Sequence, residues 1–138
     1  MDGISEAKIL IVDDEPINLE LMEELLDIND FKNIISVGSA IKAYRALEKK
    51  SFDLIILDLM MPEIDGLEAC QVIRNNPQYD HIPIIIATAV LDLGVMETAF
   101  EAGADDYVRK PIINDVELVL RIQKALKIKR KPKTEEKV

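Results

Sequence analysis

Carboxylates follow two of the most apolar segments of the chain. Asp13 and Asp14 come directly after residues 9–12, and Asp58 comes directly after residues 54–57. If these segments lie side by side, the carboxylates meet, and two of them about 4 Å apart repel by roughly 4 kcal/mol at an effective dielectric of about 20. A bound cation removes this repulsion. Carboxylate oxygens with no His or Cys nearby are ligands that Mg²⁺ prefers, so the pattern predicts a Mg²⁺ site.

Two other polar residues stand at the ends of later apolar segments. Thr88 follows residues 84–87, and Lys110 stands just beyond residues 107–108. A hydroxyl and an ammonium suit phosphate oxygens, and phosphoryl transfer is catalysed mainly by positioning and by neutralising charge. Asp58 is the best candidate nucleophile, because its apolar neighbours would hold the carboxylate rigidly. We therefore expect an aspartate that accepts a phosphoryl group.

Five short runs of Ile, Leu and Val, or of residues like them, predict the strands that would position these groups. The runs are continuous rather than alternating, which is typical of strands buried on both faces of a parallel sheet. Apolar residues recur at helical spacing between the runs, so we expect a helix after each strand. The five runs are residues 9–12, 34–37, 54–57, 84–87 and 107–108.

The predicted helices have recognisable ends and apolar stripes. Pro16 suits the first turn of the first helix, and Gly103 suits the end of the fourth. Ser39, Asp65 and Asn114 are candidate N-caps. The stripes in chain order are Ile17, Leu21, Leu25 and Ile28; Ile41, Tyr44, Ala46 and Leu47; Leu67, Val72 and Ile73; and Leu118, Val119, Ile122, Ala125 and Leu126.

Strands and helices that alternate five times predict an α/β fold with right-handed crossovers. With five strands, we expect a flavodoxin-like, doubly wound five-stranded parallel sheet of strand order 2-1-3-4-5, with five helices. In such a sheet the ligand site lies outside the carboxyl ends of the strands, at the switch point between strands 1 and 3. This rule places Asp13, Asp14 and Asp58 together.

The charge of the chain is unevenly distributed. The 138 residues carry a net charge of −9, but residues 127–138 hold six Lys or Arg and two Glu, which leaves 11 basic and 24 acidic residues in positions 1–126. A body with a net charge of about −13 repels nucleic acid, so we expect no direct nucleic-acid binding by this domain. The basic residues 128–138 indicate a tail or a truncated linker.

Nothing in the sequence suggests a membrane or an oxidising compartment. No apolar run approaches the roughly 18 residues that a spanning helix needs, and residues 1–6, an N-terminal extension, are acidic where a secretory signal would be basic. Cys70 is the single cysteine, which forbids an internal disulfide. We therefore expect a cytoplasmic protein.

The sequence resembles the receiver domains of two-component response regulators, including the bacterial chemotaxis regulator. The resemblance covers about residues 7–127, and four motifs carry it in the family's order. They are Ile11-Val12-Asp13-Asp14-Glu15; Leu57-Asp58-Leu59-Met60-Met61-Pro62 with Asp65-Gly66; Ala87-Thr88-Ala89; and Tyr107-Val108-Arg109-Lys110-Pro111. Any one motif would be weak evidence, but four at the ends of the expected strands are specific.

The resemblance implies a role for each matching residue. Asp14, Asp58 and the carbonyl of Met60 would bind Mg²⁺ directly, and Asp13 would hold a metal-bound water. Lys110, before a cis proline, and Thr88 would bind the oxygens of the phosphoryl group on Asp58. Tyr107 would fill the space that Thr88 vacates when Asp58 is phosphorylated.

The resemblance also implies partners. A sensor histidine kinase or a phosphotransfer protein would donate the phosphoryl group, and the face formed by the fourth helix, fifth strand and fifth helix would change. That face would bind an output domain or downstream protein, or a second copy in a phosphorylation-dependent homodimer. Apolar residues at Met60 and Val90 imply slower self-dephosphorylation than in chemotaxis regulators, since neither side chain can position the attacking water.

Three alternatives have specific weaknesses. An aspartate-nucleophile, Mg²⁺-dependent phosphatase of the haloacid-dehalogenase kind would need an Asp as general acid two residues after the nucleophile, where this chain has Met60. A flavodoxin-like FMN carrier would need amides and hydroxyls in the first loop, where Asp13, Asp14 and Glu15 would repel the phosphate. A pseudo-receiver that binds partners without phosphorylation stays open, although every residue that the chemistry needs is present.

Overall fold

The computed structural model describes residues 6–61, 64–89, 92–112 and 114–127. They form a five-stranded parallel sheet in the order β2-β1-β3-β4-β5, and five helices cover its two faces, which confirms the flavodoxin-like fold. The strands are β1 (Lys8–Val12), β2 (Asn33–Val37), β3 (Leu54–Asp58), β4 (Ile84–Thr88) and β5 (Asp106–Arg109). The helices are α1 (Pro16–Ile28), α2 (Ala40–Lys49), α3 (Gly66–Arg74), α4 (Leu93–Glu101) and α5 (Asp115–Lys127).

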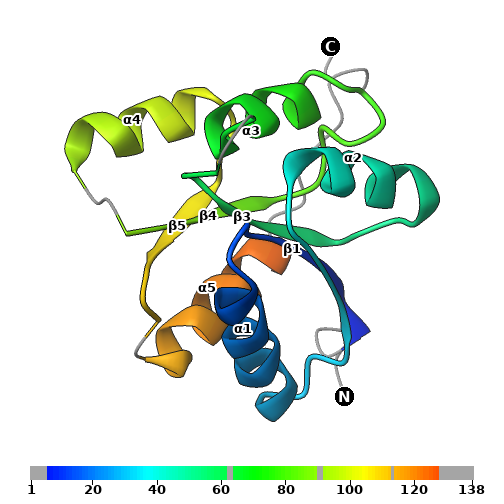
Figure 1. Cartoon of the computed structure of the whole chain (residues 1–138), viewed down its shortest axis with the longest axis vertical. Coiled ribbons are helices and arrows are strands. Elements are labelled where there is room, and N and C mark those ends of the chain that lie inside the picture. The colour runs from blue at the N-terminus through cyan, green and yellow to red at the C-terminus, as the bar shows by residue number, and fades with distance from the viewer. Residues whose placement is uncertain (1–5, 62–63, 90–91, 113, 128–138) are drawn as a thin grey trace.

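The sheet lies between two helical layers. Helices α1 and α5 cover one face, and α2, α3 and α4 cover the other (Figure 1). Each face has its own apolar core, and every residue of β3 and of β4 is buried between them. Two buried faces explain why these strands are continuous apolar runs in the sequence. None of the helices in the described residues is long and apolar enough to cross a membrane.

Side-chain caps begin several helices where the sequence predicts them. The Ser39 hydroxyl accepts a hydrogen bond from the Lys42 backbone N–H at 3.1 Å, and an Asp65 carboxylate oxygen accepts one from the Glu68 N–H at 2.9 Å. Asn114 caps α5 in the same way, accepting from the N–H of Val116 at 3.0 Å. Gly103, just after α4, has φ of 116°, a conformation that favours glycine.

Helix α1 is present, but of the apolar stripe that predicted it only Leu25 packs against the core, and the other three residues are exposed. Ile17, Leu21 and Ile28 are 65, 55 and 71% exposed. Met22 and Leu26 are buried against the sheet instead. The helix has apolar residues on both sides, so its periodicity predicts a helix without deciding which side packs inward.

The ends of the chain lie largely outside the described residues. The N-terminal extension, residues 1–6, is described only at Glu6, and the basic segment 128–138 is not described at all. The first strand, β1, starts at Lys8, and α5 is described up to Lys127, so the domain boundaries at residues 7 and 127 stay predictions. The tail or linker therefore stays a prediction from the sequence.

Candidate functional site

Three carboxylates meet at the carboxyl edge of the sheet, as the topology rule predicts. Asp13 and Asp14 follow β1, and Asp58 is the last residue of the neighbouring strand β3. One carboxylate oxygen from each of the three residues lies within 4.8 Å of the others. Asp13 and Asp58 are buried, and Asp14 is the most exposed of the three. Such a cluster, concentrated and largely removed from water, needs positive charge beside it.

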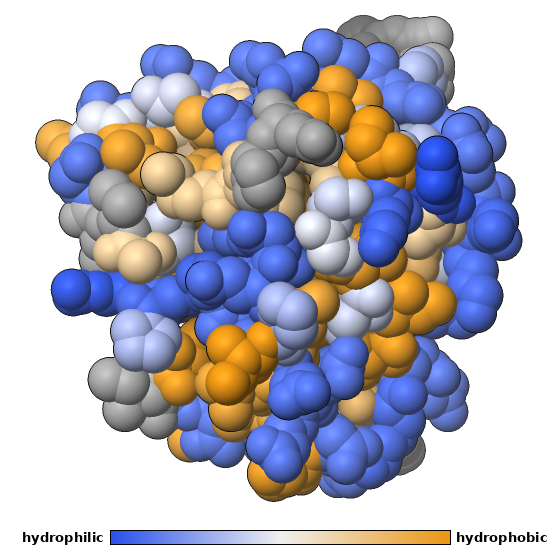
Figure 2. Space-filling view, in the orientation of Figure 1, coloured by the Kyte–Doolittle hydropathy of each residue, from blue (hydrophilic) through white to orange (hydrophobic). Residues whose placement is uncertain are grey.

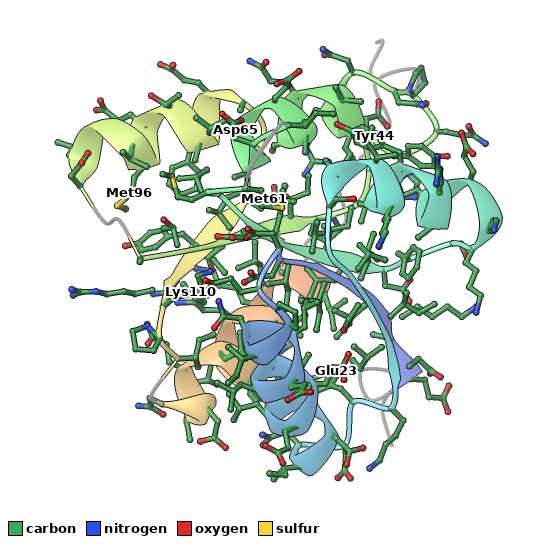
Figure 3. All side chains as sticks on the ribbon, in the orientation of Figure 1. Glu23, Tyr44, Met61, Asp65, Met96 and Lys110 are labelled. Carbon is green, nitrogen blue, oxygen red and sulfur yellow. The ribbon has the colours of Figure 1, made fainter. Side chains whose placement is uncertain are left out.

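Lys110 supplies positive charge to this cluster. Its Nζ donates to Asp13 Oδ2 at 3.0 Å and to Asp58 Oδ1 at 3.1 Å, and the lysine side chain is only 16% exposed. Figure 3 shows Lys110 beside the sheet, where β5 ends. The sequence separates Lys110 from Asp13 by 97 residues, so the strand order alone brings them together.

Burial and charge move the pKa values of Asp58 and Lys110 upward. Burial raises the pKa of the Asp58 carboxyl and the charge of Asp13 adds to this rise, although the hydrogen bond from Lys110 acts in the opposite direction. Burial alone would lower the pKa of the Lys110 ammonium, but its hydrogen bonds to Asp13 and Asp58 outweigh burial and raise it. The lysine is therefore held in its charged form.

The backbone around Asp58 is fixed by the first turn of α3. The Gly66 N–H donates to the Leu59 carbonyl at 2.9 Å, and the Met60 N–H donates to Asp58 Oδ1 at 3.3 Å. A Cβ atom at Gly66 would collide with the carbonyl oxygen of Asp58 and lie 2.7 Å from Leu59 Cα. Only glycine allows the helix to approach this closely, and the approach limits where the Asp58 carboxylate can lie.

Thr88 and Lys110 occupy the neighbouring strand ends. Thr88 ends β4, is 1% exposed, and stands one residue beyond Ala87, the partner of Asp58 in the sheet. Its carbonyl accepts a hydrogen bond from the Lys110 backbone N–H at 2.9 Å. The Lys110–Pro111 peptide bond is cis, as the resemblance implies. Met60 lies in the loop after β3 and is 63% exposed, whereas Val90 lies outside the described residues.

Tyr107 lies farther from the carboxylates, in β5, and is half-buried. Its ring makes an edge contact with Phe100 of α4, with centroids 6.3 Å apart, and the guanidinium carbon of Arg121 in α5 lies 5.2 Å from its centroid. The sequence motifs did not indicate a role for Phe100 or Arg121. Glu117, four residues before Arg121, indicates a helical ion pair, but nothing local to α5 indicates the contact with Tyr107.

The donor set of the cluster fits Mg²⁺. It offers carboxylate oxygens from Asp13, Asp14 and Asp58, with no nitrogen or sulfur ligand among the described residues of the cluster. A hard divalent cation would offset the negative charge that one lysine leaves unbalanced. The same edge carries the Thr88 strand end and the Lys110 ammonium, so an acidic pocket lies beside groups that suit phosphate oxygens.

Comparisons with known proteins agree with this geometry. A family model described as the response regulator receiver domain matches residues 9–123. The transcriptional regulatory protein YvrH of Bacillus subtilis is 38% identical over 90% of this chain, which spans only 51% of YvrH. Among solved structures, the Vibrio cholerae chemotaxis protein CheY4 is 26% identical with a TM-score of 0.80, over 86% of this chain and 98% of that one.

A second solved structure bears on the metal. The receiver domain of the sensor histidine kinase PA1611 from Pseudomonas aeruginosa, with a magnesium ion coordinated in its active site cleft, is 32% identical, with a TM-score of 0.79. The similarity covers 87% of this chain and 97% of that one. This chain therefore shares its fold with a protein that coordinates magnesium in its active site cleft.

Proposed function

Because the chain belongs to the response regulator receiver domain family of two-component systems, we propose that it accepts a phosphoryl group from a sensor histidine kinase or a phosphotransfer protein on Asp58. The observation that carries the proposal is the pair of ion pairs that Lys110 forms with Asp13 and Asp58. They join the nucleophile, the acidic cluster and an ammonium that can bind phosphate oxygens in one pocket. The chain acts as a switch, and its own chemistry is limited to gaining and losing this group.

Each residue of the pocket has a distinct task in the proposal. Asp14, Asp58 and the carbonyl of Met60 would hold Mg²⁺, and Asp13 would hold a metal-bound water. Bound Mg²⁺ supplies positive charge to the oxygens of the transferring phosphoryl group. Lys110 and Thr88 bind the remaining oxygens. The close approach of Gly66 supports this assignment, because it fixes the backbone from which Asp58 and Met60 project.

The proposed transfer is a displacement at phosphorus. A carboxylate oxygen of Asp58 forms the new P–O bond, and the P–N bond of the donor phosphohistidine breaks, with its electron pair returning to the imidazole nitrogen. Asp58 must be ionised to attack. Its pKa is raised by burial, so Lys110 favours the reaction by hydrogen bonding to the ionised form before the donor arrives.

The output of the switch is part of the proposal. The chain spans about half or less of the length of the first curated relatives that it matches, and YvrH is a transcriptional regulatory protein. We propose that the surface of α4, β5 and α5 changes on phosphorylation and acts on an output domain, a downstream protein or a second copy. A cytoplasmic location belongs to the same proposal, since the phosphodonor would be a cytoplasmic kinase domain.

The lifetime of the phosphoryl group is also part of the proposal. Water must attack phosphorus in line to remove it, and the exposed Met60 side chain offers that water no strong hydrogen bond. Val90, the other apolar residue expected near the path of the water, lies outside the described residues. Slow self-dephosphorylation, relative to chemotaxis regulators, stays a prediction that rests on side-chain polarity.

Labelling with a small phosphodonor tests the function. Acetyl phosphate with Mg²⁺ should add one phosphoryl group, seen as a mass increase of the intact protein, and EDTA should abolish the increase. Asp58→Asn should abolish it too. The matched control is Asp53→Asn, which changes an exposed aspartate just before the opposite end of β3 and should label normally.

Two results would contradict the proposal. Equal labelling of Asp58→Asn would place the phosphoryl group elsewhere, and labelling that survives EDTA would remove the metal from the reaction. Wild-type protein that takes up no phosphoryl group from acetyl phosphate or from any phosphohistidine donor would identify a pseudo-receiver instead.

A further inference from the structure

The ring of Tyr107 is held by contacts from two helices on either side of its strand. Phe100 of α4 meets it edge-on, with ring planes at 77°, and the Arg121 guanidinium of α5 lies over its face. An edge-to-face pair and a cation over a ring both favour one ring position over others. The half-buried position of Tyr107 is therefore stabilised from both sides.

Arg121 is itself fixed in place by two acidic residues. Its Nη1 donates to Asp106 Oδ1 at 2.7 Å, while its Nε and Nη2 donate to Glu117 Oε2 at 3.3 and 3.2 Å. Asp106 Oδ1 also accepts from the backbone N–H of Tyr107 at 2.8 Å. The guanidinium therefore cannot leave the ring without breaking ion pairs to β5 and to the preceding turn of α5.

Arg121 is placed at the surface rather than in either core. Its side chain is 29% exposed, and the buried residues of α5 are Leu118, Ile122 and Ala125. The fold does not need a cation at this position to fill space. Beyond its own helix, it contacts Tyr107 and Asp106, which lies next to Tyr107.

We propose that Arg121 is a positioning residue that holds Tyr107 in the half-buried position and so opposes the conformation that phosphorylation favours. This inference rests on the proposed function, because it assigns the resting position of the residue expected to respond to Asp58. A group that stabilises one of two conformers lowers the affinity of any ligand that prefers the other. Removing Arg121 should therefore make the phosphorylated conformation easier to reach.

The first measurement concerns the free protein and needs no ligand. The chain has three tyrosines, so incorporated 3-fluorotyrosine gives three ¹⁹F resonances, and Tyr107→Phe identifies the one from Tyr107. Arg121→Met should shift that resonance and leave those of Tyr44 and Tyr79 in place. Lys124→Met is the control, because Lys124 is an exposed cation one turn later on α5. An unshifted Tyr107 resonance in Arg121→Met would overturn the proposal.

The second measurement concerns coupling to the phosphorylation site. Arg121→Met should tighten the binding of beryllofluoride with Mg²⁺ by about three- to fivefold, the effect expected for losing a cation–π contact at a partly exposed ring. Arg121→Lys should lie between Met and wild type, since lysine keeps the charge without the planar fork. Unchanged or weaker binding, with Lys124→Met equal to wild type, would also overturn the proposal.

The two measurements separate this inference from the function on which it rests. Wild-type protein that fails to bind beryllofluoride with Mg²⁺ contradicts the phosphoacceptor function, while the ¹⁹F shift of the free protein still decides whether Arg121 positions Tyr107. Wild-type protein that binds beryllofluoride normally, with an Arg121→Met variant that binds it equally well, contradicts the role of Arg121 alone.

Discussion

At the scale of single residues, the pocket is a balance between negative and positive charge. Three carboxylates lie together at the carboxyl edge of the sheet, those of Asp13, Asp14 and Asp58. Lys110 offsets one of their negative charges through its ion pairs with Asp13 and Asp58. The topology rule predicted this meeting from the sequence, because it needs only the strand order and the residue at each strand end. Strand order also places Lys110 at this edge, but the two hydrogen bonds of its ammonium were not predictable, because they depend on side-chain conformation.

The opposed charges lead to a prediction about metal affinity. Asp14→Asn should weaken Mg²⁺ binding by roughly tenfold or more, because it removes a charged oxygen ligand. Lys110→Ala should leave Mg²⁺ affinity unchanged or improve it, because it removes a competing cation that bonds to Asp13 and Asp58. Isothermal titration calorimetry would measure both. Glu15→Gln is the matched control, since Glu15 is the next acidic residue and is exposed.

The sign of the lysine effect is the critical result. A clear loss of Mg²⁺ affinity in Lys110→Ala would mean that Lys110 organises the carboxylates rather than competing with the metal. Equal losses in Asp14→Asn and Glu15→Gln would instead mean that overall charge, not direct ligation, attracts the cation.

At the scale of elements, a buried ion pair joins α3 to the loop between α4 and β5. Arg74 Nη2 lies 2.7 Å from Asp105 Oδ2, and both side chains are less than a tenth exposed. Arg74 also donates to the Gly103 carbonyl at 2.8 Å, and Asp105 Oδ2 accepts from the Ile84 N–H at 2.8 Å. Asp105 directly precedes β5, and its charge joins this loop to β4 and α3.

This ion pair gives a stability prediction. Arg74→Met keeps an unbranched apolar stem beside Gly103 but removes the guanidinium from beside the buried Asp105 charge, so it should lower the free energy of unfolding by about 3–5 kcal/mol. Urea denaturation at neutral pH measures the change. Lys32→Met provides the contrast, because the Lys32–Asp27 pair is 59 and 67% exposed and should contribute no more than about 1 kcal/mol.

Similar losses in the two variants would show that burial does not govern the Arg74 pair. The pair was not predictable from the sequence, because Arg74 ends a helix and its partner lies 31 residues later. Helix ends, by contrast, depend on neighbours in the chain, so Ser39, Asp65 and Asn114 were predicted as caps correctly. Helix α1 lies between these cases. Its periodicity predicts the helix, but apolar residues on two sides leave the side that packs inward undecided.

At the scale of the whole molecule, the site and the proposed output face lie on different elements. Large apolar side chains are exposed on α4 and α5: Leu93 and Phe100 are 71 and 42% exposed, and Val116 and Leu120 are 60 and 58% exposed. Figure 2 shows apolar patches separated by a hydrophilic band on one face of the protein. Strand β5 lies between these two helices. It connects the exposed face to the acidic pocket, because Tyr107 contacts both helices and Lys110 directly follows the strand.

This arrangement predicts a long-range response. Beryllofluoride with Mg²⁺ should shift the amide resonances of α4, β5 and α5, because Tyr107 lies in β5 and contacts the two helices. Most of α2 should be unchanged, since α2 packs beside β1, two strands away from β4 and three from β5. Two-dimensional NMR of labelled protein would measure this. Shifts confined to residues beside Asp58, Thr88 and Lys110 would count against coupling through Tyr107.

The order of the strands also bears on self-association. The most apolar strands, β1, β3 and β4, each have a hydrogen-bonded neighbour on both sides, so their backbone groups are already paired. The edge strands of the sheet are β2 and β5. No residue of β2 is fully buried. Strand β5 has only four residues, and it begins with Asp106 and ends with Arg109. A short edge strand that carries charges, such as β5, is a poor template for a further strand. On the β5 side, a chain whose sheet interior is almost entirely Ile, Leu and Val is thereby protected against the strand-by-strand growth that leads to fibrils, and this protection would be lost first if β5 detached.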